Sequence, residues 1–190
     1  MVRTLIIIPR MYSMEEIKKL TGIVPEDFED ASKEFWIYIE EKLTPFYNKV
    51  KKVYCQETVK EVKETIEKLE RSREFTIIKK LADNNAEITT VEEQLLLAES
   101  KAWLEMLKKT DDQSVLELYN ENIRDRDEHI VKILNQTLND EEFGVLLFNM
   151  DHKLLLPEDI RVIKMCRFDP EDYLNRWLVT LELKRKSPRV

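Results

Sequence analysis

Glycine is nearly absent from this chain: 190 residues include only two, Gly22 and Gly144. A usual share of about 7% would give about 13. Two distant glycines cannot form a G-x-G-x-x-G dinucleotide loop or a G-x-x-x-x-G-K-S/T phosphate loop. The composition therefore excludes nucleotide binding through a glycine-rich loop. It also disfavours sandwiches and propellers, which need many tight turns.

Cysteine and histidine are also scarce, with two residues of each. Cys55 and Cys166 lie far apart in the sequence and have no second pair, so neither a zinc site nor a disulfide framework is expected. We interpret both as buried thiols. No G-x-S-x-G elbow is present, and no Ser-His-Asp or Cys-His spacing is identifiable.

Long hydrophobic runs are missing, and basic residues are fewer than acidic residues. No stretch approaches about 18 apolar residues, and residues 1–9 are too short for a signal-peptide core. The net charge of −7 and the pI near 5.1 oppose broad binding to nucleic acid or anionic membranes. We therefore expect a cytoplasmic protein with neither as a partner. The basic residues Lys184, Arg185, Lys186 and Arg189 are interpreted as a flexible, solvated tail.

Apolar side chains and charged side chains are both abundant: 43% of the residues are hydrophobic and 36% are charged. This is enough apolar material for a core, and the length suits one domain spanning 1–190. The high Glu and Lys content with little glycine is typical of heat-adapted proteins.

Short apolar runs alternate with helical patterns along the chain. Strands are predicted over 4–8, 50–55, 86–91, 144–149 and 161–166, and helices over 15–20, 28–43, 59–81, 92–109, 114–138 and from 170 onward. Strands separated by helices predict an α/β fold with three layers: a mostly parallel sheet of about five strands with helices on both faces. The run over 4–8 is apolar at nearly every position, which is typical of a central strand. In the helix over 92–109, Leu95, Leu96, Ala98, Ala102, Trp103 and Met106 are expected to face inward.

In open α/β sheets, ligands bind at the carboxyl ends of the strands. The polar residues that follow the predicted strands are therefore candidates: Arg10, Tyr12 and Ser13; Gln56 and Glu57; Glu92 and Glu93; Asp151 and His152; and Arg167.

One helix carries a carboxylate on its apolar side. At 100° per residue, Asp127 falls near the middle of the stripe formed by Ile123, Ile130, Val131, Leu134 and Leu138. A buried charge needs a partner, and Arg124 and Arg126 border the stripe. Two interpretations remain open: an ion pair that fixes the helix to the sheet, or a guanidinium that binds a carboxylate or phosphate. His129 is expected to face solvent.

His152 directly follows a buried strand and Asp151. An imidazole there would act as a general base or a metal ligand, or else as an ordinary hydrogen-bonded loop residue. A metal would need carboxylates such as Glu57, Glu92 or Asp151 as further ligands, and an oxygen-rich set favours Mg²⁺ or Mn²⁺. The sequence leaves both metal and cofactor unknown.

The second half of the chain resembles the TraB, ChaN and erythromycin-esterase-like superfamily. The resemblance is carried by the stretch 122–130, the residues Ile133 and Leu138, the run 144–148, His152 and the segment 156–162. The resemblance implies a three-layer α/β fold with a pocket at the strand ends. It also implies motif roles for His152, Arg124, Arg126 and Asp127. The family's Gly-Thr-x-His-like turn after the first strand is replaced here by residues 9–13, which contain no histidine. That difference weakens the case for a histidine-assisted or metal-assisted mechanism.

Two hypotheses follow. In the first, the chain is a hydrolase-like or ligand-binding pocket protein that takes a small anionic or peptide-like ligand. His152 is its catalytic candidate, and its binding candidates are Arg10, Tyr12, Glu92, Arg124, Arg126 and Asp127. In the second, it is a non-catalytic interaction or self-assembling module, such as a homo-oligomer. The large residues Phe35, Trp36, Trp103 and Trp177 would then cover a partner, although they also suit a core.

Overall fold

A computed structural model describes residues 2–67, 73–148 and 153–186. Five parallel strands form one sheet in the order β3-β2-β4-β1-β5. Their bounds are β1 Arg3–Pro9, β2 Val50–Cys55, β3 Glu87–Thr90, β4 Phe143–Phe148 and β5 Ile160–Lys164. The predicted α/β class and parallel sheet are confirmed. The expectations for Asp151, His152 and Arg189 lie outside the described residues.

Strand β1 is an interior strand, because β4 pairs on one side and β5 on the other. Hydrogen bonds continue past the strand ends: Arg10 N donates to the Phe148 carbonyl at 2.9 Å, and Val91 N donates to the Cys55 carbonyl at 3.0 Å. These bonds fix the backbone of the residues that follow β1 and β3. The polar side chains after the strands therefore start from defined positions.

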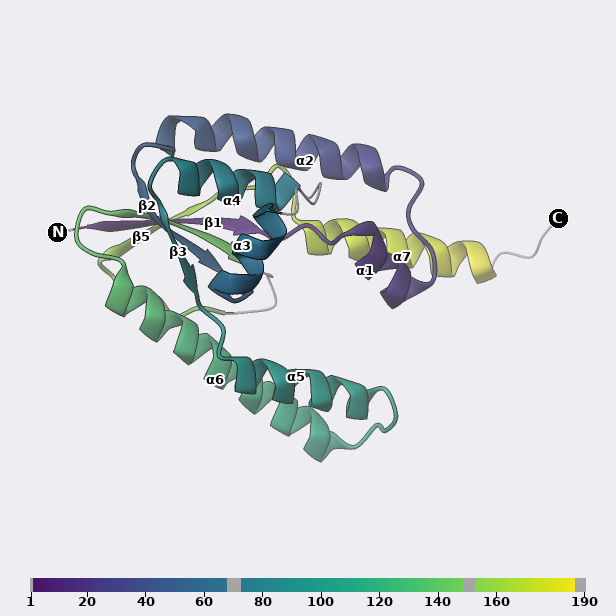
Figure 1. Ribbon diagram of the computed structural model, residues 1–190. Coiled ribbons are helices and arrows are strands. Elements are labelled where there is room, and N and C mark those ends of the chain that lie inside the picture. Colours follow the sequence, from purple (N-terminus) through teal and green to yellow (C-terminus); the bar gives the residue numbers. More distant parts are fainter. Residues whose placement is uncertain (1, 68–72, 149–152, 187–190) are drawn as a thin grey trace.

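The helices are α1 Met14–Thr21, α2 Phe28–Leu43, α3 Val59–Glu67, α4 Arg73–Asp83, α5 Gln94–Leu107, α6 Gln113–Thr137 and α7 Pro170–Lys186, with a 3-10 turn over Thr44–Phe46. Helices α2 and α4 lie on one side of the sheet and α6 lies on the other (Figure 1). None of the helices in the described ranges combines the length and apolar character that crossing a bilayer requires.

Alternate residues of the strands pack into two separate hydrophobic cores, one on each face of the sheet. Ile6, Ile8, Val53, Val145 and Leu147 pack with α2 and α4. On the other face, Leu5, Tyr54, Leu146 and Phe148 pack with Ile130 and Leu134 of α6 and with Leu138, which follows that helix. Because successive strand side chains point to opposite faces, continuous apolar runs such as 5–8 fill both cores at once. Trp36 and Phe35 lie in the first core, as the core-filling interpretation expects.

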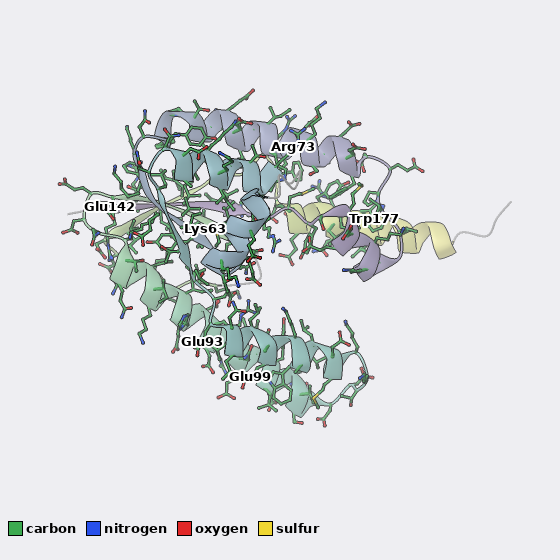
Figure 2. All side chains as sticks on the ribbon, viewed as in Figure 1. Lys63, Arg73, Glu93, Glu99, Glu142 and Trp177 are labelled. Carbon is green, nitrogen blue, oxygen red and sulfur yellow. The ribbon has the colours of Figure 1, made fainter. Side chains whose placement is uncertain are left out.

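Helices α5 and α6 form an antiparallel hairpin that extends beyond the sheet (Figure 1). Figure 2 labels Glu93 where α5 begins, and Glu99 farther along the hairpin. The predicted inward face of α5 is wrong in part: Leu95 is 70% exposed and Met106 is 44% exposed. The buried residue of α5 is Ser100, because α5 packs mainly against α6 and so buries a narrow stripe.

The connection after β1 is fixed by a helix cap. The Ser13 side chain accepts from Glu16 N at 3.2 Å, and the Glu16 carboxylate accepts from Ser13 N at 2.7 Å. This reciprocal pair starts α1 at Met14, with four residues between the strand and the helix. Ser13, a candidate site residue by its position in the sequence, therefore serves as a helix cap. Gly22 ends α1 at a φ of 82°, a conformation that suits glycine.

Candidate functional site

A cleft of about 440 Å³ opens at the carboxyl ends of β1 and β2, against the inner side of the α5–α6 hairpin. We call it the strand-end cleft. Its lining comprises Arg10, Glu16, Gln56, Glu57, Glu61, Gln94, Leu97, Ser100, Lys101, Leu104, Tyr119, Ile123 and Arg126. The cleft therefore lies where parallel α/β sheets bind their ligands, as the order of the predicted elements indicated.

Arg10 lies between two carboxylates. Its Nη2 is 3.2 Å from Glu57 Oε1, and its Nε donates to Glu74 Oε2 at 3.3 Å. Glu57 follows β2 and Glu74 lies in the first turn of α4, so three elements meet at one guanidinium. The guanidinium, a group with five N–H donors, therefore lies at the edge of the cleft.

Glu74 is buried, and burial raises the pKa of its carboxyl to about 7. The neighbouring Arg10 guanidinium acts in the opposite direction, and the Glu57 carboxylate adds to the rise. A carboxyl that titrates near neutral pH can accept or donate a proton in that range. Burial lowers the pKa of Arg10, but its acidic neighbours outweigh this and the net shift is upward.

Arg126 forms the second charged centre of the cleft. Its Nη2 is 2.5 Å from Glu92 Oε1, its Nε donates to Glu92 Oε2 at 3.0 Å, and its Nη1 donates to Ser100 Oγ at 3.1 Å. Gln56 also donates to Glu92, at 3.2 Å. Both charged side chains are almost fully buried. The pair joins the segment after β3 to α6 and holds the Arg126 side chain in place in the lining of the cleft.

This pair corrects the prediction for α6. Arg126 faces inward, whereas Asp127 is partly exposed and accepts a hydrogen bond from Lys153 N at 3.1 Å. The carboxylate that partners Arg126 is Glu92, which comes from the segment after β3. The sequence pattern predicted the buried carboxylate of such an ion pair at Asp127; the structure places it at Glu92.

The hairpin gives the cleft an apolar wall. Leu97 and Leu104 of α5 and Tyr119 and Ile123 of α6 line it opposite the polar strand ends. Leu104 is 41% exposed, so its side chain offers surface to a ligand. The cleft can therefore hold a molecule with both a polar and an apolar part.

The other predicted binding residues lie elsewhere. Arg124 and Asp127 line a different pocket, beside Lys153 and Leu155 and on another side of α6 from Arg126. Tyr12 lines a larger cavity between the turn after β1, α2 and α4, which we call the aromatic cavity. The structure therefore brings Arg10, Glu92 and Arg126 together at the strand-end cleft and separates Arg124, Asp127 and Tyr12 from it. His152 lies outside the described residues.

The remaining groups with possible metal-binding or nucleophilic chemistry are the two cysteines, the acidic residues and His129 of the described ranges. No group of three or more His, Cys, Asp or Glu side chains there is arranged to hold a metal ion. Both cysteines are free; Cys55 is buried, which raises the pKa of its thiol, and Cys166 is partly buried. His129 Nδ1 lies 3.6 Å from Glu93 Oε2, at the end of the hairpin beside the sheet, where α5 begins.

Glu74 and Ser100 were not among the predicted site residues. Glu74 lies three and four residues before Ile77 and Ile78, in phase with the buried stripe of α4. That phase is a detectable sign of a buried carboxylate. Ser100 has no such sign, because the residues of α5 are apolar on more than one side.

Comparisons with known proteins add no relative: no family model, no curated protein and no solved structure matches the chain.

Proposed function

We propose that the protein binds a small peptide-like ligand in the strand-end cleft. The observation that carries the proposal is the pairing of a polar floor, at Arg10, Gln56 and Glu57, with an apolar wall on the α5–α6 hairpin. Ligand sites in proteins commonly combine an apolar lining with a few placed polar groups. A peptide offers carbonyls to Arg10, an amino group to Glu57, and an apolar side chain to Leu104.

The charges of the cleft favour this ligand over a purely anionic one. Arg10, Lys101 and Arg126 are matched by Glu16, Glu57 and Glu61, and Glu92 lies directly behind Arg126. A phosphate or dicarboxylate would meet as many carboxylates as cations. A zwitterionic or uncharged ligand meets no net repulsion.

Calorimetric titration with dipeptides that carry one apolar side chain, starting from Leu-Ser, tests the proposal. Leu104→Asp places a charge in the apolar wall and should weaken binding at least tenfold. Leu118→Asp is the matched control, because Leu118 lies in the neighbouring helix and is 42% exposed but does not line the cleft. Absence of binding for the whole dipeptide set, or equal loss in both variants, contradicts the proposal.

A hydrolytic role for the same protein rests on the resemblance to the TraB, ChaN and erythromycin-esterase-like superfamily and on His152. Glu74, with its carboxyl pKa near 7, supplies a further acid–base group. A broad hydrolase screen with and without divalent metals tests this role. Absence of turnover contradicts this role, and turnover that His152→Ala and Glu74→Gln both leave unchanged removes these two residues from the catalytic assignment.

The alternative, a self-assembling module, has its own supporting observation. Leu95 and Met106 lie on one exposed face of α5, and Ala98 and Ala102 between them are exposed as well. Apolar residues in such a row suit packing against the same face of a second copy. Binding at the cleft does not conflict with this association, because Leu95 and Met106 do not line the cleft.

A further inference from the structure

The aromatic cavity lies next to the strand-end cleft and shares two of its lining residues, Arg10 and Glu16. Its volume is about 800 Å³. Its apolar lining comes from the turn after β1, from α1, from α2 and from α4, and comprises Met11, Tyr12, Met14, Phe28, Trp36 and Phe75. The proposed function assigns a ligand to the strand-end cleft and none to the aromatic cavity.

The geometry of Arg10 connects the two spaces. Its Nη2 lies against Glu57, which lines the strand-end cleft, and its Nε binds Glu74, which lines the aromatic cavity. The guanidinium is thus held from both sides at the boundary. A planar guanidinium with several N–H donors at such a boundary is suited to a backbone carbonyl that passes from one space to the other.

The aromatic cavity is balanced in charge, like the cleft. Its cations are Arg10, Lys19, Lys33 and Arg73, and its anions are Glu15, Glu16, Glu29 and Glu74. Each cavity alone has a size typical of a site for one small molecule. Together they suit a longer chain with apolar side chains and little net charge.

We infer that the ligand is an oligopeptide that occupies both cavities, with its backbone crossing at Arg10 and Glu16 and apolar side chains in each cavity. This inference rests on the proposed function and extends it from a small peptide-like ligand to a chain longer than a dipeptide. The peptide places one apolar side chain against Leu104 and Ile123, and another beside Trp36 and Phe75.

A length series tests the inference: Leu-Ser, Leu-Ser-Phe-Ser and Leu-Ser-Phe-Ser-Leu-Ser, each titrated by calorimetry into the full chain. The hexapeptide should bind at least tenfold more tightly than the dipeptide. Ser32 lies on α2 in the lining of the aromatic cavity only. Ser32→Phe fills part of that cavity and should reduce hexapeptide affinity to the dipeptide level, with dipeptide affinity unchanged.

Trp36 gives a second readout that requires no substitution in the protein. The chain has three tryptophans, and Trp36 is the one that lines the aromatic cavity. Its indole N–H signal in an ¹H–¹⁵N spectrum of the unmodified protein should shift with the hexapeptide and stay in place with the dipeptide. Equal affinity along the series, or hexapeptide binding without a shift at Trp36, overturns the two-cavity inference and leaves the proposed function intact. Failure of every peptide to bind overturns both.

Discussion

Arg126 and Glu92 form a buried ion pair in which the guanidinium donates through Nε at 3.0 Å and approaches through Nη2 at 2.5 Å. Removal of one partner leaves a charge without compensation in the protein interior. Arg126→Met should therefore destabilise the fold by about 3–5 kcal/mol. Urea unfolding monitored by circular dichroism measures the change.

Two further variants separate the charge effect from lost packing. The double variant Glu92→Leu with Arg126→Met removes both charges and should recover most of the lost stability. Arg124→Met, at an exposed position in the same helix, should change stability by no more than about 0.5 kcal/mol. A double variant as unstable as Arg126→Met alone would contradict this account.

The same pair shows what the sequence could and could not predict. Apolar runs and helical spacing were sufficient for the strands, for most helices and for the interior position of β1, because burial on both faces leaves a clear pattern. The single helix predicted over 59–81 is instead two helices, α3 and α4. Helix α6 was harder, since its first half packs on α5 and its second half packs on the sheet. The buried stripe runs through Asn122 and Arg126, which are polar, so hydrophobicity alone placed its centre one residue late, at Asp127.

The candidate site was predictable to the extent that it follows from strand order. Arg10, Gln56, Glu57 and Glu92 follow strands, and a parallel sheet brings them to one edge. Arg124 and Asp127 face another pocket, because neighbouring helix residues point about 100° apart. Glu74 enters from α4, and its contact with Arg10 depends on tertiary packing across 64 positions of sequence.

Glu74 makes stability depend on pH. Its carboxyl has a pKa of about 7 in the folded protein against 4.5 as the ordinary value, so the folded state keeps this proton to higher pH. The contribution to stability is complete below about pH 4.5 and is lost as the pH rises through 7. The loss amounts to roughly 3 kcal/mol.

Comparison of wild type with Glu74→Gln isolates this effect, because the amide does not titrate. The stability of the wild type relative to Glu74→Gln should fall between pH 5 and pH 8 in urea unfolding. Glu41→Gln, at an exposed position of α2, should show no such difference. Parallel stability profiles for wild type and Glu74→Gln would contradict the assignment.

Gly144 begins the buried part of β4 and has no room for a side chain. A Cβ there would lie 2.9 Å from Tyr54 Cε2 and 3.2 Å from Leu138 Cδ1. Gly144→Ala should destabilise the protein by about 1–3 kcal/mol through overpacking, measured as a lower urea midpoint. The comparison is Gly22→Asn, where nothing lies within 4 Å and asparagine tolerates the positive φ. That variant should change stability little, and an equal loss at both positions would exclude the steric explanation for Gly144.

Leu95 and Met106 should determine whether the chain self-associates. Both lie on the exposed face of α5, and antiparallel packing of two α5 helices would cover them together with Ala98 and Ala102. Light scattering over a concentration series should show a mass above 22.8 kDa that falls on dilution. Leu95→Lys with Met106→Lys adds two charges per copy to the shared face and should weaken association at least tenfold. Val179→Lys, at a position 58% exposed on α7, is the control and should leave the mass unchanged. A strict monomer at all concentrations would remove the self-assembling alternative, and association that survives the double variant would place the interface on another surface.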